Sequence, residues 1–93
     1  MKVHKARVII SGRVQGVGFR QYIRTVAHEL GLTGWVKNNS LGTVEAFIEG
    51  SSEGIELFLH ACKKGPSFAK VERVSETIFQ GEAEFNNFSV LYS

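Results

Sequence analysis

A chain of 93 residues has room for one small domain and none for a separate cofactor-binding domain. With 43% hydrophobic and 22% charged residues, its composition is typical of a soluble globular protein and argues against a disordered chain. No apolar run approaches the roughly 20 residues that span a bilayer, and the N-terminus lacks the apolar segment of a signal peptide. The single cysteine, Cys62, excludes an internal disulfide framework, so a cytoplasmic, reduced protein is expected.

Positive charge is concentrated in the first half of the chain. The first 44 residues contain seven lysines and arginines but a single acid, Glu29. Such a basic segment suggests an anionic partner, either a small ligand or a nucleic acid. All nine acidic residues are glutamates, which argues against mechanisms built on an aspartyl phosphate or on magnesium held by aspartate.

The first third of the chain is predicted to form a strand, a helix and a second strand. Residues 5–11 alternate between two faces, which is typical of a strand. From Phe19 to Leu30, apolar residues recur at helical spacing, and Gly31 is suited to cap the C-terminus of this amphipathic helix. Residues 33–39 form the next predicted strand.

The remaining elements complete the order βαββαβ, with a short final strand. After a turn at 39–42, alternation predicts a strand over 43–49. A second helix is predicted from an N-cap at Ser52 to Lys64, before a strong stop signal at 65–66. Two more strands are predicted over 69–79 and 88–92.

The first two strands are joined by a helix, so they are expected to run parallel. Their carboxyl ends then lie on the same side of the sheet, where open α/β sheets commonly bind ligands. The glycine-rich loop at 12–18 and the asparagine pair at 38–39 are therefore expected to share one site.

The segment 15–20 has the composition of an anion-binding loop. It leads into the first turn of the predicted helix, where backbone N–H groups lack internal partners and the helix dipole favours negative charge. Gly16 and Gly18 allow tight folding around an anion, and Arg20 can make a bidentate contact with two phosphate oxygens. The loop fits neither the Walker nor the Rossmann pattern, so generic motifs leave open both a phosphate cradle and a simple turn.

Longer motifs extend this interpretation. The string GRVQGVGFR at 12–20, followed by GWVKN at 34–38 and GTVE at 42–45, closely resembles the acylphosphatase family. The segments at 65–74 and 88–90 resemble later signatures of the same family, so the resemblance covers nearly the whole chain. It implies a single domain over residues 1–93 with an α+β fold, a ferredoxin-like α/β sandwich in which two helices pack on one face of a mainly antiparallel sheet. It also implies an enzyme that hydrolyses acyl phosphates to a carboxylate and inorganic phosphate without a metal ion or other cofactor.

The resemblance assigns roles to individual residues. Arg20 resembles the catalytic, phosphate-binding arginine of the family, and Asn38 resembles the residue that orients the attacking water. The cradle is completed by backbone N–H groups, those of Gln15, Gly16, Val17, Gly18 and Phe19. Leu41 departs from the family, in which this turn position more often carries a polar or charged residue, so motion of the turn or access of the substrate is expected to differ.

The expected partner is a small acyl phosphate, and inorganic phosphate or sulfate is expected to fit the same site. No nucleic acid or membrane partner is expected, and the protein is expected to be a monomer. Trp35 is expected to be a packing aromatic and Cys62 a small core residue. The three histidines show no metal-ligand spacing.

Two alternative functions remain open. The ferredoxin-like topology also occurs in RNA-binding modules, and GFRQY at 18–22 weakly resembles an aromatic RNA-binding motif. However, Phe19 and Tyr22 lie on the predicted apolar face of the helix, where they are not available for base stacking. The other alternative is a non-catalytic acylphosphatase-like domain, as found in hydrogenase-maturation carbamoyl transferases, although 93 residues lack the further domains of such a protein.

Overall fold

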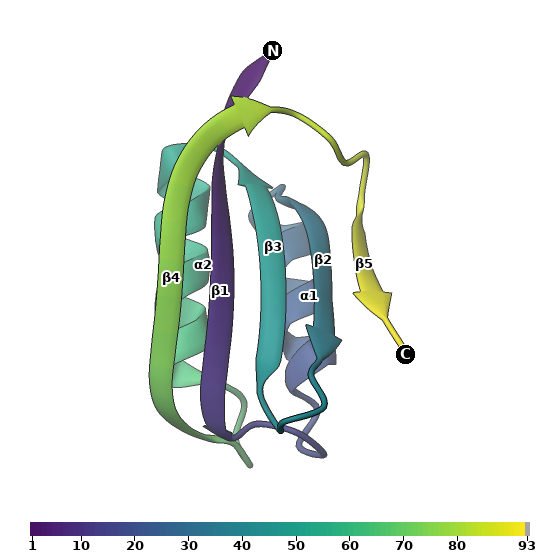
Figure 1. Cartoon of the computed structure of the whole chain (residues 1–93), viewed down its shortest axis with the longest axis vertical. Coiled ribbons are helices and arrows are strands. Elements are labelled where there is room, and N and C mark those ends of the chain that lie inside the picture. Colours follow the sequence, from purple (N-terminus) through teal and green to yellow (C-terminus); the bar gives the residue numbers. More distant parts are fainter. Residues whose placement is uncertain (93) are drawn as a thin grey trace.

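The computed structural model describes residues 1–92 and confirms the predicted order of elements. The strands form one mixed sheet in the order β4-β1-β3-β2-β5, in which only the β2–β5 pair is parallel. Two helices cover one face of this sheet (Figure 1), which confirms the ferredoxin-like α+β sandwich. The elements are β1 (Lys2–Arg13), α1 (Phe19–Glu29), β2 (Thr33–Asn38), β3 (Val44–Gly50), α2 (Ser52–Lys64), β4 (Lys70–Glu82) and β5 (Phe88–Leu91).

Three strands end at the same end of the sheet. β3 lies between β1 and β2 and is antiparallel to both, so β1 and β2 run in the same direction, as predicted, without being neighbours. β5 runs parallel to β2. The β1–α1 loop and the β2–β3 turn therefore lie together at the lower end of the sheet in Figure 1. Neither helix in the described residues has the length and apolarity needed to cross a membrane.

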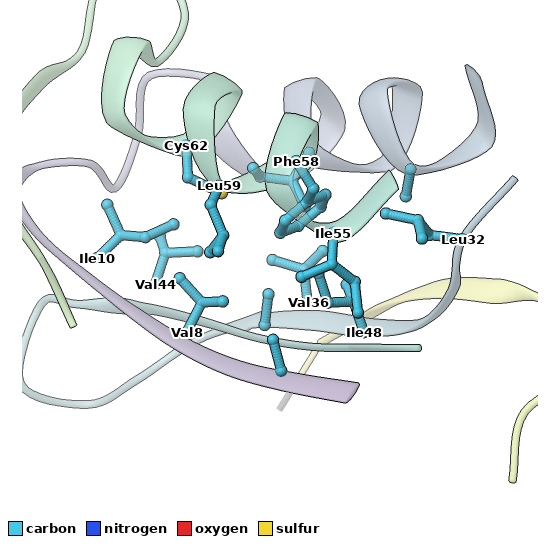
Figure 2. Packing of buried hydrophobic residues seen from close by; sticks show 14 of the residues in the cluster. Val8, Ile10, Leu32, Val36, Val44, Ile48, Ile55, Phe58, Leu59 and Cys62 are labelled. Carbon is cyan, nitrogen blue, oxygen red and sulfur yellow. The ribbon is translucent and has the colours of Figure 1, made fainter. Parts of the chain in front are cut away.

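The hydrophobic core lies between the helices and the sheet. Ala6, Val8 and Ile10 of β1 are fully buried because alternate residues of a strand face the same side. Phe58, Leu59 and Cys62 of α2 belong to the same core cluster and face the sheet from the helix side (Figure 2). Cys62 belongs to this core, as predicted, and its burial raises the pKa of its thiol far above the ordinary value.

The caps of the two helices agree with those predicted from the sequence, except at one position. Gly31, which follows α1, adopts a left-handed φ of 67° and donates its N–H to the carbonyl of His28, as expected for a C-terminal cap. The N-cap of α2 is Ser51, so the prediction of Ser52 was wrong by one position. Ser51 has the extended backbone that a cap requires, and its hydroxyl accepts a hydrogen bond from the Gly54 N–H at 3.0 Å.

Aromatic rings cluster on the sheet face opposite the core. Trp35 stacks on Phe47 with ring centroids 6.1 Å apart, and Phe79 and Phe85 meet the Phe47 ring edge-on. The ammonium of Lys37 lies 5.4 Å from the centre of the Trp35 ring. Trp35 is thus a packing aromatic, on the open face of the sheet and not in the core beneath the helices.

A buried ion pair ties the β4–β5 connection to the sheet. The side chains of Lys5 and Glu49 are each 2% exposed, and Lys5 Nζ lies 3.4 Å from Glu49 Oε2. The backbone N–H groups of Glu84 and Phe85 each donate to Glu49 Oε1 at 2.8 Å. Burial by itself raises the pKa of Glu49, but these N–H donors and Lys5 outweigh it, so the net pKa is below the ordinary value.

Glu49→Gln is expected to be less stable than the wild type near pH 7 and to lose less stability on acidification. The folded-state pKa of Glu49 is lowered, so the stabilisation from its carboxylate is fully present above the unfolded pKa. It disappears as the pH falls through the folded pKa. Urea unfolding measured from about pH 7 to about pH 3 checks this. Parallel stability curves for the two proteins would contradict it.

Gly34→Ala is expected to lower the free energy of unfolding by about 3 kcal/mol or more. Gly34 in β2 has a φ of 136°, which L side chains rarely adopt, and an added Cβ would lie 1.8 Å from the carbonyl oxygen of Phe47 in β3. Gly42→Ala is the matched control, because Gly42 also has a positive φ (94°) but has open space where the Cβ would lie. Urea unfolding is expected to show a clearly smaller loss for the control, and equal losses would contradict the steric argument.

Candidate active site

A small pocket lies at the end of the sheet where β1 and β2 finish. Its volume is about 100 Å³. The β1–α1 loop, the start of α1, the end of β2 and the residue after β5 contribute its walls. The lining residues are Val14, Gly16, Gly18, Phe19, Arg20, Gln21, Asn38 and Tyr92.

The structure thus brings together most of the residues singled out in the sequence. Arg20, in the first turn of α1, and Asn38, at the end of β2, line the same pocket. Gly16, Gly18 and Phe19 from the predicted cradle also line it. Gln15 and Val17 belong to the same loop but are not among the residues that line the pocket.

The chain leaves the sheet for this loop through an irregularity in β1. The register between β1 and β4 shifts between Ser11 and Gly12, where Gly12 has a φ of 122°. A Cβ at Gly12 would lie 2.2 Å from the carbonyl oxygen of Lys70, so only glycine fits there without a shift of the backbone. Gly12 begins the family motif at 12–20, but the bulge was not predicted from the sequence.

Backbone conformation makes the loop suitable for an anion. Gly16 and Gly18 have left-handed φ values of 74° and 77°, whereas Val17 between them has a negative φ. Alternation of this kind is typical of backbone turns whose successive N–H groups converge on an anion. Gly18 is the N-cap of α1 and provides no side-chain cap. Within the described residues, the N–H groups of residues 15–19 have no hydrogen-bond acceptor in the protein. These donors and the positive end of the α1 dipole therefore favour a negatively charged ligand.

Arg20 adds a full positive charge to this end of the helix. It lies in the first turn of α1 and is half-buried. No carboxylate in residues 1–92 forms an ion pair with its guanidinium group. The Tyr92 ring, in contrast, lies 4.7 Å from Arg20 Cζ, which is cation–π distance. The guanidinium N–H groups consequently remain available for a phosphate.

Tyr92 also lines the pocket, but it was not predicted from the sequence as a site residue. It follows β5, and it reaches the pocket because β5 pairs in parallel with β2. No local pattern near the end of the chain indicates this long-range pairing. Tyr92 is 70% exposed, so its contact with Arg20 lies at the rim of the pocket.

Tyr92→Leu is expected to lower kcat/KM for an acyl phosphate about two- to fivefold, because an exposed cation–π contact contributes roughly 0.5–1 kcal/mol. Tyr92→Phe retains the ring and is expected to stay close to the wild type. Steady-state kinetics of the three proteins check this. A Leu variant as active as the Phe variant would show that the ring does not hold Arg20.

Asn38 stands at the end of β2 and is half-buried. In the described part of the chain, its side chain makes no hydrogen bond to another residue, unlike its neighbour Asn39, whose Nδ2 donates to Thr43 Oγ1 at 3.0 Å. The Asn38 amide therefore remains able to bind a ligand or a water molecule. Residues 1–92 contain no group of three or more histidine, cysteine, aspartate or glutamate side chains positioned to hold a metal ion.

The fold is that of an α+β protein in which a glycine-rich loop, the start of a helix and an asparagine line one pocket. An acylphosphatase family model matches residues 6–90. An acylphosphatase from Acidiphilium cryptum is 47% identical over 77 residues, which cover 83% of this chain and 85% of that protein. The crystal structure of acylphosphatase from Bacillus subtilis has a TM-score of 0.93 and 39% identity, and the match covers 96% of this chain and 99% of that one.

The chain belongs to the acylphosphatase family, as its motifs predicted. It is an enzyme of this family, and its activity is acyl phosphate hydrolysis. The crystal structure of full-length HypF in the phosphate- and nucleotide-bound form is also similar, with a TM-score of 0.85 and 31% identity. That match covers 99% of this chain but only 12% of the HypF chain.

Proposed function

We propose that this chain hydrolyses acyl phosphates without a metal ion, using Arg20, Asn38 and the backbone N–H groups of residues 15–19. The observation that carries the assignment is that Arg20, Asn38 and the glycine loop line one pocket of about 100 Å³. This volume suits a phosphoryl group, with the acyl part of the substrate extending past the rim.

Arg20 and the loop bind the phosphoryl group. The guanidinium group donates two hydrogen bonds to phosphoryl oxygens, and the N–H groups of residues 15–19 donate to the remaining oxygens. Negative charge is spread over these oxygens in the transition state of phosphoryl transfer. Because the donors are held by the start of α1 and by the left-handed glycines of the loop, they need little rearrangement when this charge shifts.

Asn38 orients the nucleophile. Its amide holds a water molecule in line with the bond between phosphorus and the acyl oxygen. The water oxygen forms a bond to phosphorus, and the acyl oxygen leaves with the bonding electron pair as a carboxylate. Asparagine is not a useful base, so the proton from water passes to a phosphoryl oxygen. A carboxylate is a good leaving group, and the reaction therefore requires no general acid.

Further proposals concern the chain as a whole. We propose that residues 1–93 form one domain that acts as a cytoplasmic monomer and does not bind nucleic acid. The single core between helices and sheet supports one domain. Phe19, the first residue of α1, is buried in the core, which argues against a base-stacking role for its ring. The buried free thiol of Cys62 agrees with a reducing compartment.

Hydrolysis of benzoyl phosphate by the wild-type protein, with a chelator present, tests the proposed function. We expect rapid turnover that is unaffected by the chelator and competitively inhibited by inorganic phosphate. If the protein binds phosphate but hydrolyses nothing, the non-catalytic alternative replaces the proposal. Retention of RNA that weakens with salt would instead support the nucleic-acid-binding alternative.

A further inference from the structure

The side chain of Gln15 connects the phosphate-binding loop to the β2–β3 turn. Gln15 Nε2 donates to the carbonyl oxygen of Asn39 at 2.8 Å and to that of Thr43 at 2.9 Å. These two carbonyls belong to the residues that close the turn, since the Asn39 N–H donates to the Thr43 carbonyl at 2.8 Å. Both hydrogens of one amide nitrogen are therefore used to hold the two sides of the turn.

This connection is suited to control the position of Asn38. Asn38 is adjacent to Asn39, so any shift of the clamped backbone moves the Asn38 side chain. In the described residues, the other hydrogen bonds of the turn run within the turn itself, from the Gly42 N–H to the Asn39 carbonyl at 3.1 Å and from Asn39 Nδ2 to Thr43 Oγ1 at 3.0 Å. The two bonds from Gln15 are those that join the turn to another loop, and Leu41 at its tip is 93% exposed. The Gln15 side chain binds the turn and is not among the groups that line the pocket, so its loss removes no contact with the ligand.

We propose that Gln15 is a positioning residue whose side chain fixes the β2–β3 turn, and with it Asn38, relative to the phosphoryl group bound by its own loop. This inference rests on the proposed role of Asn38. One loop then both binds the phosphoryl group, through its backbone, and sets the location of the attacking water, through this side chain. A misplacement of about 1 Å in such an arrangement can lower the rate about 100-fold without weakening binding.

Gln15→Met tests the proposal, because methionine retains the length and volume of the side chain but donates no hydrogen bond. We expect kcat for benzoyl phosphate to fall about tenfold or more. The KM and the inhibition constant of inorganic phosphate are expected to change less than about twofold, because the backbone cradle and Arg20 remain. Gln80→Met is the matched control, since Gln80 is exposed on β4, and it is expected to behave as the wild type.

The decisive comparison repeats Gln15→Met in the Asn38→Ala background. If Gln15 acts through Asn38, the additional fall in kcat is expected to be less than about twofold. An equal fall in both backgrounds, or an inhibition constant of phosphate that rises as much as kcat falls, overturns the proposal. A wild-type kcat in the Asn38→Ala variant alone would instead refute the proposed role of Asn38. Failure of the Gln15 proposal can therefore be distinguished from failure of the proposed function.

Gln15→Glu provides a second variant if the methionine protein does not fold. Glutamate retains the shape of the side chain but replaces the donor nitrogen with an acceptor that faces the two carbonyls. Circular dichroism establishes folding, and the same kinetic comparison with Asn38→Ala applies. If neither variant folds, the clamp serves stability and the proposal is wrong.

Discussion

Replacing Arg20 with alanine is expected to lower kcat/KM for benzoyl phosphate by a factor of about 1,000 or more. Arg20 carries the full positive charge among the groups that line the pocket, and no carboxylate of the described residues is paired with it. Its loss leaves neutral N–H donors to stabilise the charge of the transferring group. Because the proposed mechanism places Arg20 in contact with both the bound and the reacting phosphoryl group, inorganic phosphate is expected to bind much more weakly as well.

Arg24→Ala is the matched control for this result. Arg24 lies one turn later on α1 and is exposed, so its removal changes the net charge equally without touching the pocket. Arg20→Lys is expected to recover only part of the activity, because lysine retains the charge but not the planar, bidentate donor. Steady-state kinetics and phosphate inhibition distinguish these outcomes. An Arg20→Ala protein that retains most of its activity would remove Arg20 from the mechanism.

Replacing Asn38 with alanine is expected to have a different kinetic signature. We expect kcat to fall about 100- to 1,000-fold, comparable with the loss of a positioned polar group in other active sites. The inhibition constant of phosphate is expected to change less than about threefold, because the loop and Arg20 still bind the anion. A fall in kcat with binding retained is the effect expected of a residue that acts on water and not on phosphate.

Asn86→Ala is the control for Asn38. Asn86 is exposed in the β4–β5 connection and is not among the residues that line the pocket. Its replacement is expected to leave kcat and KM unchanged. If Asn38→Ala weakens phosphate binding as strongly as it lowers kcat, Asn38 is a binding group for the anion, and the nucleophilic water must be held elsewhere.

The sequence predicted most of the fold because its signals are local and periodic. Alternation in β1 and the apolar stripe of α1 repeat over many residues, so tertiary context seldom overrides them. The boundary at Ser51 and Ser52 was harder, because both serines suit a cap and only the backbone conformation distinguishes them. The bulge at Gly12 was not predicted because it depends on contact with β4, nearly 60 residues later in the chain.

The residues of the candidate site also differ in whether local sequence signals predict them. The loop at 15–19 and Arg20 are consecutive, so the chemistry of an anion site could be predicted from their sequence alone. Asn38 was linked to them by the parallel direction of β1 and β2 and by the family motifs. Tyr92 and the side-chain bonds of Gln15 escaped prediction, because each joins segments whose proximity only the assembled sheet determines.

In the proposed mechanism water attacks phosphorus and not the acyl carbon, and the fate of the water oxygen tests this most directly. Benzoyl phosphate is hydrolysed by the wild-type protein in water enriched in oxygen-18, and both products are examined by mass spectrometry. The proposed mechanism predicts one labelled oxygen in inorganic phosphate and none in benzoate, because the bond between phosphorus and the acyl oxygen breaks. Label in benzoate would show attack at the carbonyl carbon and contradict in-line transfer of the phosphoryl group in this pocket.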